Sequence, residues 1–214
     1  MLVKIYIFVV ITYIKQIMKK IFLSTLLASF TFLSIAANPH IVYTKVSTES
    51  SVVKWTGSKI ASSHEGTVKI QDGVLDINHG TLVGGNFTID MNSIACTDIE
   101  SAKKNAYFVS HLKNEDFFNV ESFPTASIKI TNVARGQGSF YKVVADLTIK
   151  GITHSISFAA DVKIAGKKYT ADAKIKIDRT KWDIVYKSGS IFKDLGDKII
   201  LDEIEFDISL ISAN

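Results

Sequence analysis

The residues best suited to chemistry in this 214-residue chain are five histidines and a single cysteine. His64 is followed directly by Glu65, and a histidine beside a carboxylate can act as a general base or help to bind a metal ion. The histidines are scattered, however, and show neither HxH nor HExxH spacing. The pattern therefore predicts no metal site at His64, at His154 or at the other histidines.

Cys96 cannot form a disulfide within the chain or complete a four-cysteine zinc site, because it is the only cysteine. A nucleophilic cysteine needs a neighbouring base that lowers its pKa. The nearest histidines in sequence, His79 and His111, fall on other expected elements. We therefore expect Cys96 to be a small, semi-buried apolar residue.

No catalytic or nucleotide-binding motif indicates a further site. The chain has no GxSxG elbow, no P-loop and no GxGxxG that opens a helix. Gly84-Gly85 precedes a strand pattern and is expected to form a bend. The sequence predicts no catalytic residue and no cofactor.

The positive charge of the chain comes from its first 36 residues, which contain Lys4, Lys15, Lys19 and Lys20 and no acidic residue. The rest carries 21 of the 25 basic residues against all 21 acidic ones. A nucleic-acid-binding protein needs a basic patch that neutralises phosphates. No block of like charge is present, so we expect no nucleic-acid partner.

The N-terminal segment is typical of a secretory signal peptide, with a basic start, an apolar run over residues 21–33 and small residues at Ser34 and Ala36. The pattern predicts cleavage after Ala36 and a periplasmic or secreted protein. No cysteine follows the run, so a lipoprotein anchor is not indicated.

Residues 1–17 contain a second apolar stretch in front of the signal pattern. We interpret them as an upstream start-site extension, with the natural start at Met18. The alternative is an uncleaved membrane anchor, but the apolar stretch is shorter than the ~20 residues that a spanning helix needs. We expect residues 1–36 to be removed, residues 37–214 to form one domain, and the mature chain to have no stable membrane span.

From residue 41 onward, apolar residues recur mostly at every second position, which is typical of strands with one face in an apolar interior. The clearest run has Ile204, Phe206 and Ile208 alternating with Glu205 and Asp207. Similar patterns occupy residues 51–57, 67–71, 74–77, 86–91, 126–130, 141–149, 156–162 and 171–177. Asp72-Gly73, between two alternating runs, predicts a hairpin turn.

One segment has helical spacing instead. Thr97 and Glu100 fit a capping box, and Ala102, Ala106, Val109 and Leu112 would share one helix face. A second helical turn is expected over residues 192–195, ended by Gly196. Because the strands are consecutive and do not alternate with helices, the sequence predicts an all-β, eight-stranded antiparallel up-and-down barrel with one substantial helix. Eight strands give an interior that can hold one small ligand.

Five stretches of the chain carry a family resemblance. The most specific runs from HLKNEDFFN at His111 through FPTA at Phe123, and the others are WTGSK at Trp55 with HEGTV at His64, GGNFTIDMNSI at Gly84, LTIKGIT at Leu147, and DRTKW at Asp178 through YKSGS at Tyr186. Together they resemble the YceI family of secreted bacterial proteins with a lipocalin-like barrel. Three positions depart from the family pattern: Asn119 replaces an aspartate, Ala145-Asp146 replaces a glycine, and Asp183 replaces a glycine. The last change brings into question the tight turn after Trp182.

The resemblance implies a long apolar pocket for an isoprenoid, quinone-type or fatty-amide lipid, and it also implies homodimers. We expect non-catalytic transport or sequestration of such a lipid. The predicted ligand-binding residues are the inward aromatic residues and two polar residues: Trp55, Phe87, His111, Phe118, Phe158, Arg179, Trp182, Tyr186 and Phe206.

Each candidate has a structural alternative, which for the aromatic residues is ordinary core packing. His111 could donate a hydrogen bond to a lipid headgroup or bond a loop carbonyl at the helix end. Asp116 could pair with Lys113 or with Arg179, and Arg179 could form a structural ion pair or contact the headgroup.

Two alternative functions are compatible with the sequence. One is an enzyme that acts on such a lipid with His111 or His64 as base together with Asp116. The other is a stress-response interaction module with an incidental cavity.

Overall fold

A computed structural model describes residues 12–16, 18 and 40–213. The chain separates into two units, Met1–Pro39 and His40–Asn214. The predicted signal peptide, residues 1–36, therefore lies almost entirely outside the described residues. Within the described ranges, no helix combines the length and the apolar character that crossing a bilayer requires.

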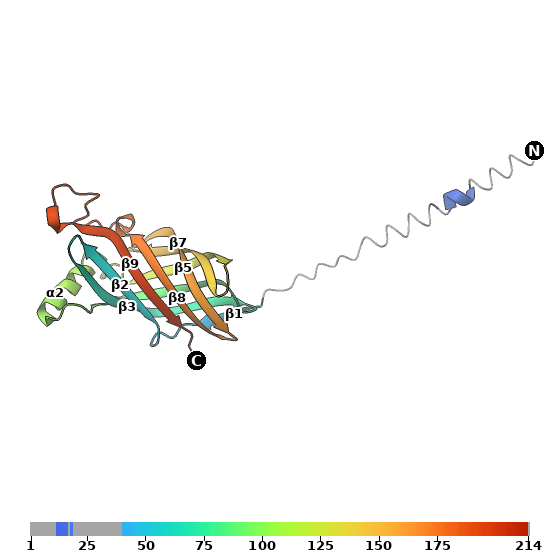
Figure 1. Ribbon diagram of the computed structural model, residues 1–214, viewed down its shortest axis with the longest axis horizontal. Helices are drawn as coiled ribbons and strands as arrows, with labels where there is room; N and C mark the ends of the chain where they lie inside the picture. The colour runs from blue at the N-terminus through green and yellow to red at the C-terminus, as the bar shows by residue number, and fades with distance from the viewer. Residues whose placement is uncertain (1–11, 17, 19–39, 214) are drawn as a thin grey trace, which may run out of the picture. The chain divides into compact units, whose positions relative to one another are not determined.

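The second unit is a closed barrel of antiparallel strands (Figure 1). Strands β2 to β9 each pair with the next one along the chain, and β9 pairs back with β2. A ninth strand, β1, pairs with β3. The predicted eight-stranded up-and-down barrel is confirmed, with one extra strand. The strands are β1 Ile41–Lys45, β2 Val52–Lys59, β3 Ser63–Asn78, β4 Thr81–Cys96, β5 Thr125–Arg135, β6 Phe140–Ile149, β7 Ile152–Ala165, β8 Lys168–Asp178 and β9 Ile200–Ile211.

The alternation in β9 separates an apolar inner face from a charged outer face. Phe206 and Ile208 face the interior, and the register places them opposite Trp55 and Val53 of β2. On the outer face, Lys176 of β8 lies 2.7 Å from the carboxylate of Glu205. The period of two therefore predicted correctly which side chains point inward.

The hairpin predicted at Asp72-Gly73 is wrong, because β3 runs unbroken through both residues. The chain turns instead at His79-Gly80, where both φ values are positive, 47° and 73°, as a type I′ hairpin turn requires. Gly73 lies opposite Phe87, and a Cβ at Gly73 would overlap the Phe87 ring. This glycine therefore makes room for an aromatic ring and does not bend the chain.

The expected bend at Gly84-Gly85 is also corrected, since both glycines lie inside β4. They pair with Asp76 and Leu75, next to a register shift between β3 and β4. The strand that they were expected to precede begins at Thr81.

The helix α2 spans Ala102–Lys113, as predicted, but the predicted capping box is wrong. Ser101 is the N-cap residue and makes no side-chain cap bond, while the Thr97 hydroxyl donates to the carbonyl of Glu65. Thr97 lies too far before the helix to cap it. The short helical segment expected at residues 192–195 is replaced by a 3₁₀ turn, η2 Gly196–Lys198, which begins at Gly196.

The buried face of α2 differs from the prediction. Leu112 is buried, but Ala102 and Ala106 are exposed. Phe108 packs against the core, and the Asn105 amide donates to the carbonyls of Cys96 and Ile99. The helix is therefore oriented by a polar side chain that bonds the end of β4, which an apolar pattern cannot reveal.

The turn that the departure at Asp183 brought into question does form. It follows the 3₁₀ helix η1 Arg179–Trp182, and Asp183 has φ 56° and ψ 36°, the left-handed conformation. Aspartate adopts this conformation more readily than most residues, because its short polar side chain can bond locally. Asp183 therefore adopts a conformation that is most accessible to glycine.

We predict that Asp183→Gly will be more stable than Asp183→Ala by about 1 kcal/mol, the approximate cost of a Cβ in left-handed backbone. Both variants lose the 3.8 Å ion pair with Lys150, so the difference between them isolates the backbone effect. Urea unfolding of the two variants measures it. Equal stability would show that the turn does not strain the chain.

Candidate functional site

The barrel encloses a cavity of about 250 Å³, close to the lower end of the ~300–1,000 Å³ typical of small-molecule sites. Nearly all of its lining is apolar, because alternate residues of each strand face inward. Every barrel strand contributes to it, for example through Val53, Val68, Phe87, Ile128, Val143, Phe158, Ile175 and Phe206.

Polar residues gather at one part of the cavity lining, in and beside the β2–β3 hairpin. Ser58, Lys59, Ser62 and His64 contribute there. Helix α2 lies at the same end of the barrel (Figure 1), and its Phe108 ring lies 4.7 Å from the His64 ring, centroid to centroid. The two serines and the lysine could not be predicted as lining residues, because polar residues between two strands predict only a turn.

Five of the nine predicted ligand-binding residues are aromatic residues that line the cavity: Trp55, Phe87, Phe118, Phe158 and Phe206. Trp55 and Phe87 lie opposite Gly66 and Gly73, and a Cβ on either glycine would overlap the facing ring. Each ring therefore lies over the backbone of the neighbouring strand.

The other two predicted aromatic residues do not line the cavity. Trp182 is buried beside it, with its indole N–H donating to the carbonyl of Leu147 and its ring edge-on to His154. Tyr186 packs against Phe117 and His111, with ring centroids 5.4 and 4.8 Å away. Both residues belong to the irregular segment between β8 and β9, where no strand period indicates which way a side chain points.

His111 also lies away from the cavity lining. Its Nε2 is 2.9 Å from Oδ2 of Asp116. His111 therefore bonds a carboxylate, whereas the structural alternative predicted a bond to a loop carbonyl at the helix end. Both predicted partners of Asp116 are wrong. Lys113 donates to the carbonyl of Asn92, and Arg179 pairs with Asp202.

Arg179 borders the cavity, but its guanidinium group makes several contacts within the protein. It donates to the carbonyls of Ile184, Ile200 and Leu201 at 2.7, 3.0 and 3.1 Å, and lies 3.1 Å from the Asp202 carboxylate. Burial lowers its pKa, which the nearby carboxylates partly offset. The group is therefore a structural clamp that joins the end of β8 to the start of β9.

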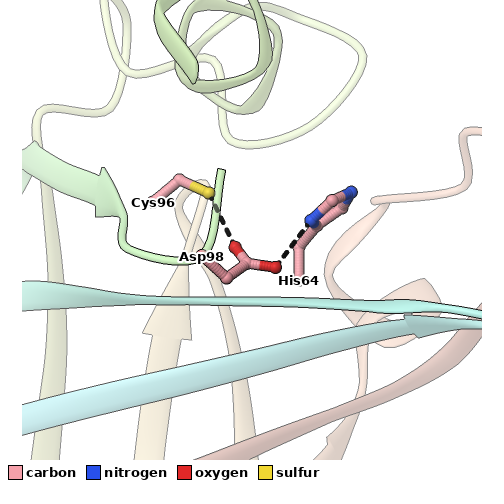
Figure 2. Close-up of side chains that lie close together, drawn as sticks. All are labelled: His64, Cys96 and Asp98. Atoms are coloured by element: carbon pink, nitrogen blue, oxygen red, sulfur yellow. Dashed lines mark hydrogen bonds and ion pairs between the residues drawn. The ribbon is translucent and has the colours of Figure 1, made fainter. Parts of the chain in front are cut away.

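His64 and Cys96 come together through Asp98 (Figure 2). The Asp98 carboxylate lies 2.9 Å from His64 Nδ1 through one oxygen and 3.0 Å from Cys96 Sγ through the other. The register explains this proximity, because Cys96 pairs with Gly66, two residues along β3 from His64. This cluster was not predicted, because the turn expected at Asp72-Gly73 would have broken the β3–β4 pairing that builds it.

The protonation of this cluster follows from its surroundings. Burial raises the pKa of the Cys96 thiol, and the Asp98 carboxylate raises it further, although backbone N–H groups oppose the shift. Burial also acts to raise the pKa of Asp98, but hydrogen bonds from Cys96, His64 and the Glu65 backbone outweigh it, so this pKa is lowered. The arrangement favours a neutral thiol beside a carboxylate, which is not an activated nucleophile.

Comparison with known families gives a match to the YceI-like domain over residues 43–211. Among curated proteins, the chain is 30% identical over 112 residues to UPF0312 protein plu2095 of Photorhabdus laumondii, covering 44% of this chain and 56% of that protein. It is 30% identical over 100 residues to Protein YceI of Salmonella arizonae, covering 43% and 48%. The chain spans about half the length of the curated relatives that it matches.

Solved structures with the same fold include BcnA of Burkholderia cenocepacia, with a TM-score of 0.64, 22% identity, and coverage of 78% of this chain and 99% of that one. A polyisoprenoid binding domain from Saccharophagus degradans aligns with a TM-score of 0.57 at 13% identity, covering 82% and 98%. At these identities, the likeness shows the fold alone.

We predict that Arg179→Ala will destabilise the barrel by roughly 3–5 kcal/mol, because it leaves Asp202 without its buried partner and three carbonyls without donors. The matched control is Arg135→Ala, since Arg135 is exposed and makes one long bond to Thr81. The control should change stability by no more than about 0.5 kcal/mol. Chemical denaturation measures both variants, and an equal effect would contradict the clamp.

Proposed function

This chain belongs to the YceI-like domain family, and from that premise we propose that it is a lipid-binding protein that holds an apolar chain inside its barrel. The observation that carries the proposal is the cavity, which is apolar over nearly its whole lining and has polar residues gathered around one hairpin. An amphiphile has the same division into a long apolar part and a small polar part.

The energetics favour a ligand with a long hydrocarbon chain. Each CH₂ group buried in the cavity contributes about 0.8 kcal/mol, so affinity rises with chain length. The few polar side chains, Ser58, Lys59, Ser62 and His64, would fix the orientation of a headgroup.

The ligand class that we propose is an isoprenoid, quinone-type or fatty-amide lipid. The Saccharophagus degradans neighbour, described as a polyisoprenoid binding domain, supports this class. A homodimer, which the family resemblance implies, stays a prediction.

We propose binding without catalysis, for transport or sequestration. The enzyme alternative relied on His111 or His64 as base together with Asp116. His111 pairs with Asp116, but within the described residues it does not border the cavity. His64 borders the cavity, but its partner is Asp98 and not Asp116. A base must lie within hydrogen-bond reach of the proton that it removes. The site of the proposed lipid and the site of the proposed acid–base pair are therefore separate.

We also propose that the protein acts in the periplasm or outside the cell. The N-terminal pattern of lysines, apolar run and small residues supports export. A lipid that must cross an aqueous compartment needs a carrier that shields its chain from water.

The cavity can be tested with a matched pair of substitutions in β7. Ala160 is buried and lines the cavity, whereas its neighbour Ala159 is exposed. We predict that Ala160→Phe will weaken binding of an isoprenoid-tailed quinone at least roughly tenfold by filling the cavity, and that Ala159→Phe will not. Quenching of Trp55 fluorescence by the quinone reports occupancy, since Trp55 lines the cavity.

Circular dichroism first establishes that both variants fold, and Ala173→Leu provides a smaller filling substitution on β8 if Ala160→Phe does not fold. Mass spectrometry of lipid extracted from the purified protein identifies the native ligand. Unchanged quinone binding in a folded, cavity-filled variant would overturn the proposal. If the cellular phenotype survived the loss of binding, the incidental-cavity alternative would gain.

Export predicts a mature protein whose first residue is Ala37. Edman sequencing or intact mass measurement of the protein recovered from the periplasm or medium tests this directly. A first residue before position 30 would contradict cleavage.

A further inference from the structure

We propose that His64, Cys96 and Asp98 form a binding site for a divalent transition-metal ion, with zinc as the best-suited ion, beside the β2–β3 hairpin. One ligand atom from each residue lies within 4.8 Å of the others. Figure 2 shows the Asp98 carboxylate between the imidazole and the thiol, with one oxygen toward each. The proposal does not depend on lipid binding.

The donor set matches zinc chemistry. Zinc is held by imidazole nitrogen, thiolate sulfur and carboxylate oxygen at about 2.0–2.3 Å, so ligand atoms of a tetrahedral site lie roughly 3.3–3.8 Å apart. The present contacts, 2.9 Å from His64 to Asp98 and 3.0 Å from Cys96 to Asp98, are hydrogen bonds. Binding an ion through one Asp98 oxygen requires the hydrogen-bonded atoms to separate, and the ligand atoms that lie up to 4.8 Å apart to approach, by about 1 Å or less in each case. Side-chain rotation can supply shifts of this size.

The charge balance also fits a divalent cation. Bound zinc displaces the thiol proton, which leaves to solvent or buffer, and the thiolate and the carboxylate then carry two negative charges. The neutral imidazole supplies the third ligand without adding charge. Three protein ligands leave one tetrahedral position for water or another small donor.

Several contacts hold the three ligands in place. The Glu65 N–H donates to Asp98 Oδ1 at 3.3 Å, and the Thr97 N–H donates to the Glu65 carbonyl at 2.9 Å. The Phe108 ring of α2 packs against His64. Such supporting contacts orient ligands before an ion arrives and strengthen metal binding.

A second histidine–aspartate pair provides an internal control. His111 and Asp116 lie 2.9 Å apart, the same separation as His64 and Asp98, and both histidines are partly exposed. The chain has no second cysteine to complete that pair. Metal binding by the three-residue cluster should therefore depend on His64 and not on His111.

The test is titration of Co²⁺, a spectroscopic substitute for zinc, into the purified full chain after reduction and removal of metal with a chelator. We expect one equivalent to bind with a sulfur-to-cobalt charge-transfer band in the near ultraviolet, and zinc to displace it. Cys96→Ser should abolish this band, and His64→Gln should weaken binding at least roughly tenfold. His111→Gln should leave both the band and the affinity unchanged.

Thermal unfolding gives a second readout. Zinc should raise the unfolding temperature of the original protein and of His111→Gln, but not that of Cys96→Ser, because an ion that binds only the folded state stabilises it. Asp98→Asn, which keeps the side-chain shape, provides a further variant if the cysteine variant does not fold. Absence of the charge-transfer band, or equal effects of His64→Gln and His111→Gln, would overturn the proposal.

Discussion

Pairing of β9 with β2 is the constraint on which the rest of the structure depends, because it closes the sheet into a barrel with an inside and an outside. Closure satisfies the backbone groups that an open edge would leave exposed. Because the barrel is closed, every second residue of each strand faces one shared interior, and this explains why apolar residues recur at every second position. Phe206 opposite Trp55 and Ile208 opposite Val53 show how both closing strands contribute to that interior.

The two longest connections of the barrel pack against each other. The segment from α2 to β5 supplies Phe117 and His111, and the segment from β8 to β9 supplies Tyr186, which contacts both. The Arg179–Asp202 pair fixes the second connection to the strands that it joins. Residues of the family-like stretches that begin at His111 and Asp178 thus form the packed connections at the barrel. Their polar side chains His111 and Arg179 bond other residues of the protein.

The fold was predicted mainly from the alternation of apolar and polar residues along the strands. The incorrect predictions have physical causes. The barrel was predicted from alternation together with the uninterrupted order of the strands, and the inward orientation of Phe158 and Phe206 follows from alternation. The hairpin predicted at Asp72-Gly73 does not form, because packing of Phe87 over Gly73 overrides the local turn preference. The orientations of Trp182 and Tyr186 could not be predicted, since irregular segments have no period.

The His64–Asp98–Cys96 cluster could not be predicted either, because it depends on the register of two 16-residue strands. A slip of one residue would turn Cys96 to the opposite face of the sheet. His64 lies more than thirty residues before Cys96 and Asp98 in sequence, and strand pairing brings them together. The spacing of residues within one segment gives no information about this pairing.

The interior space depends on small side chains. Ala160 and Ala173 both line the cavity, and larger residues at these positions would fill it. Filling it would add packing contacts within the protein, but it would remove the space in which each buried CH₂ group of a hydrocarbon chain contributes about 0.8 kcal/mol. Small residues at these two positions are therefore suited to the proposed lipid site.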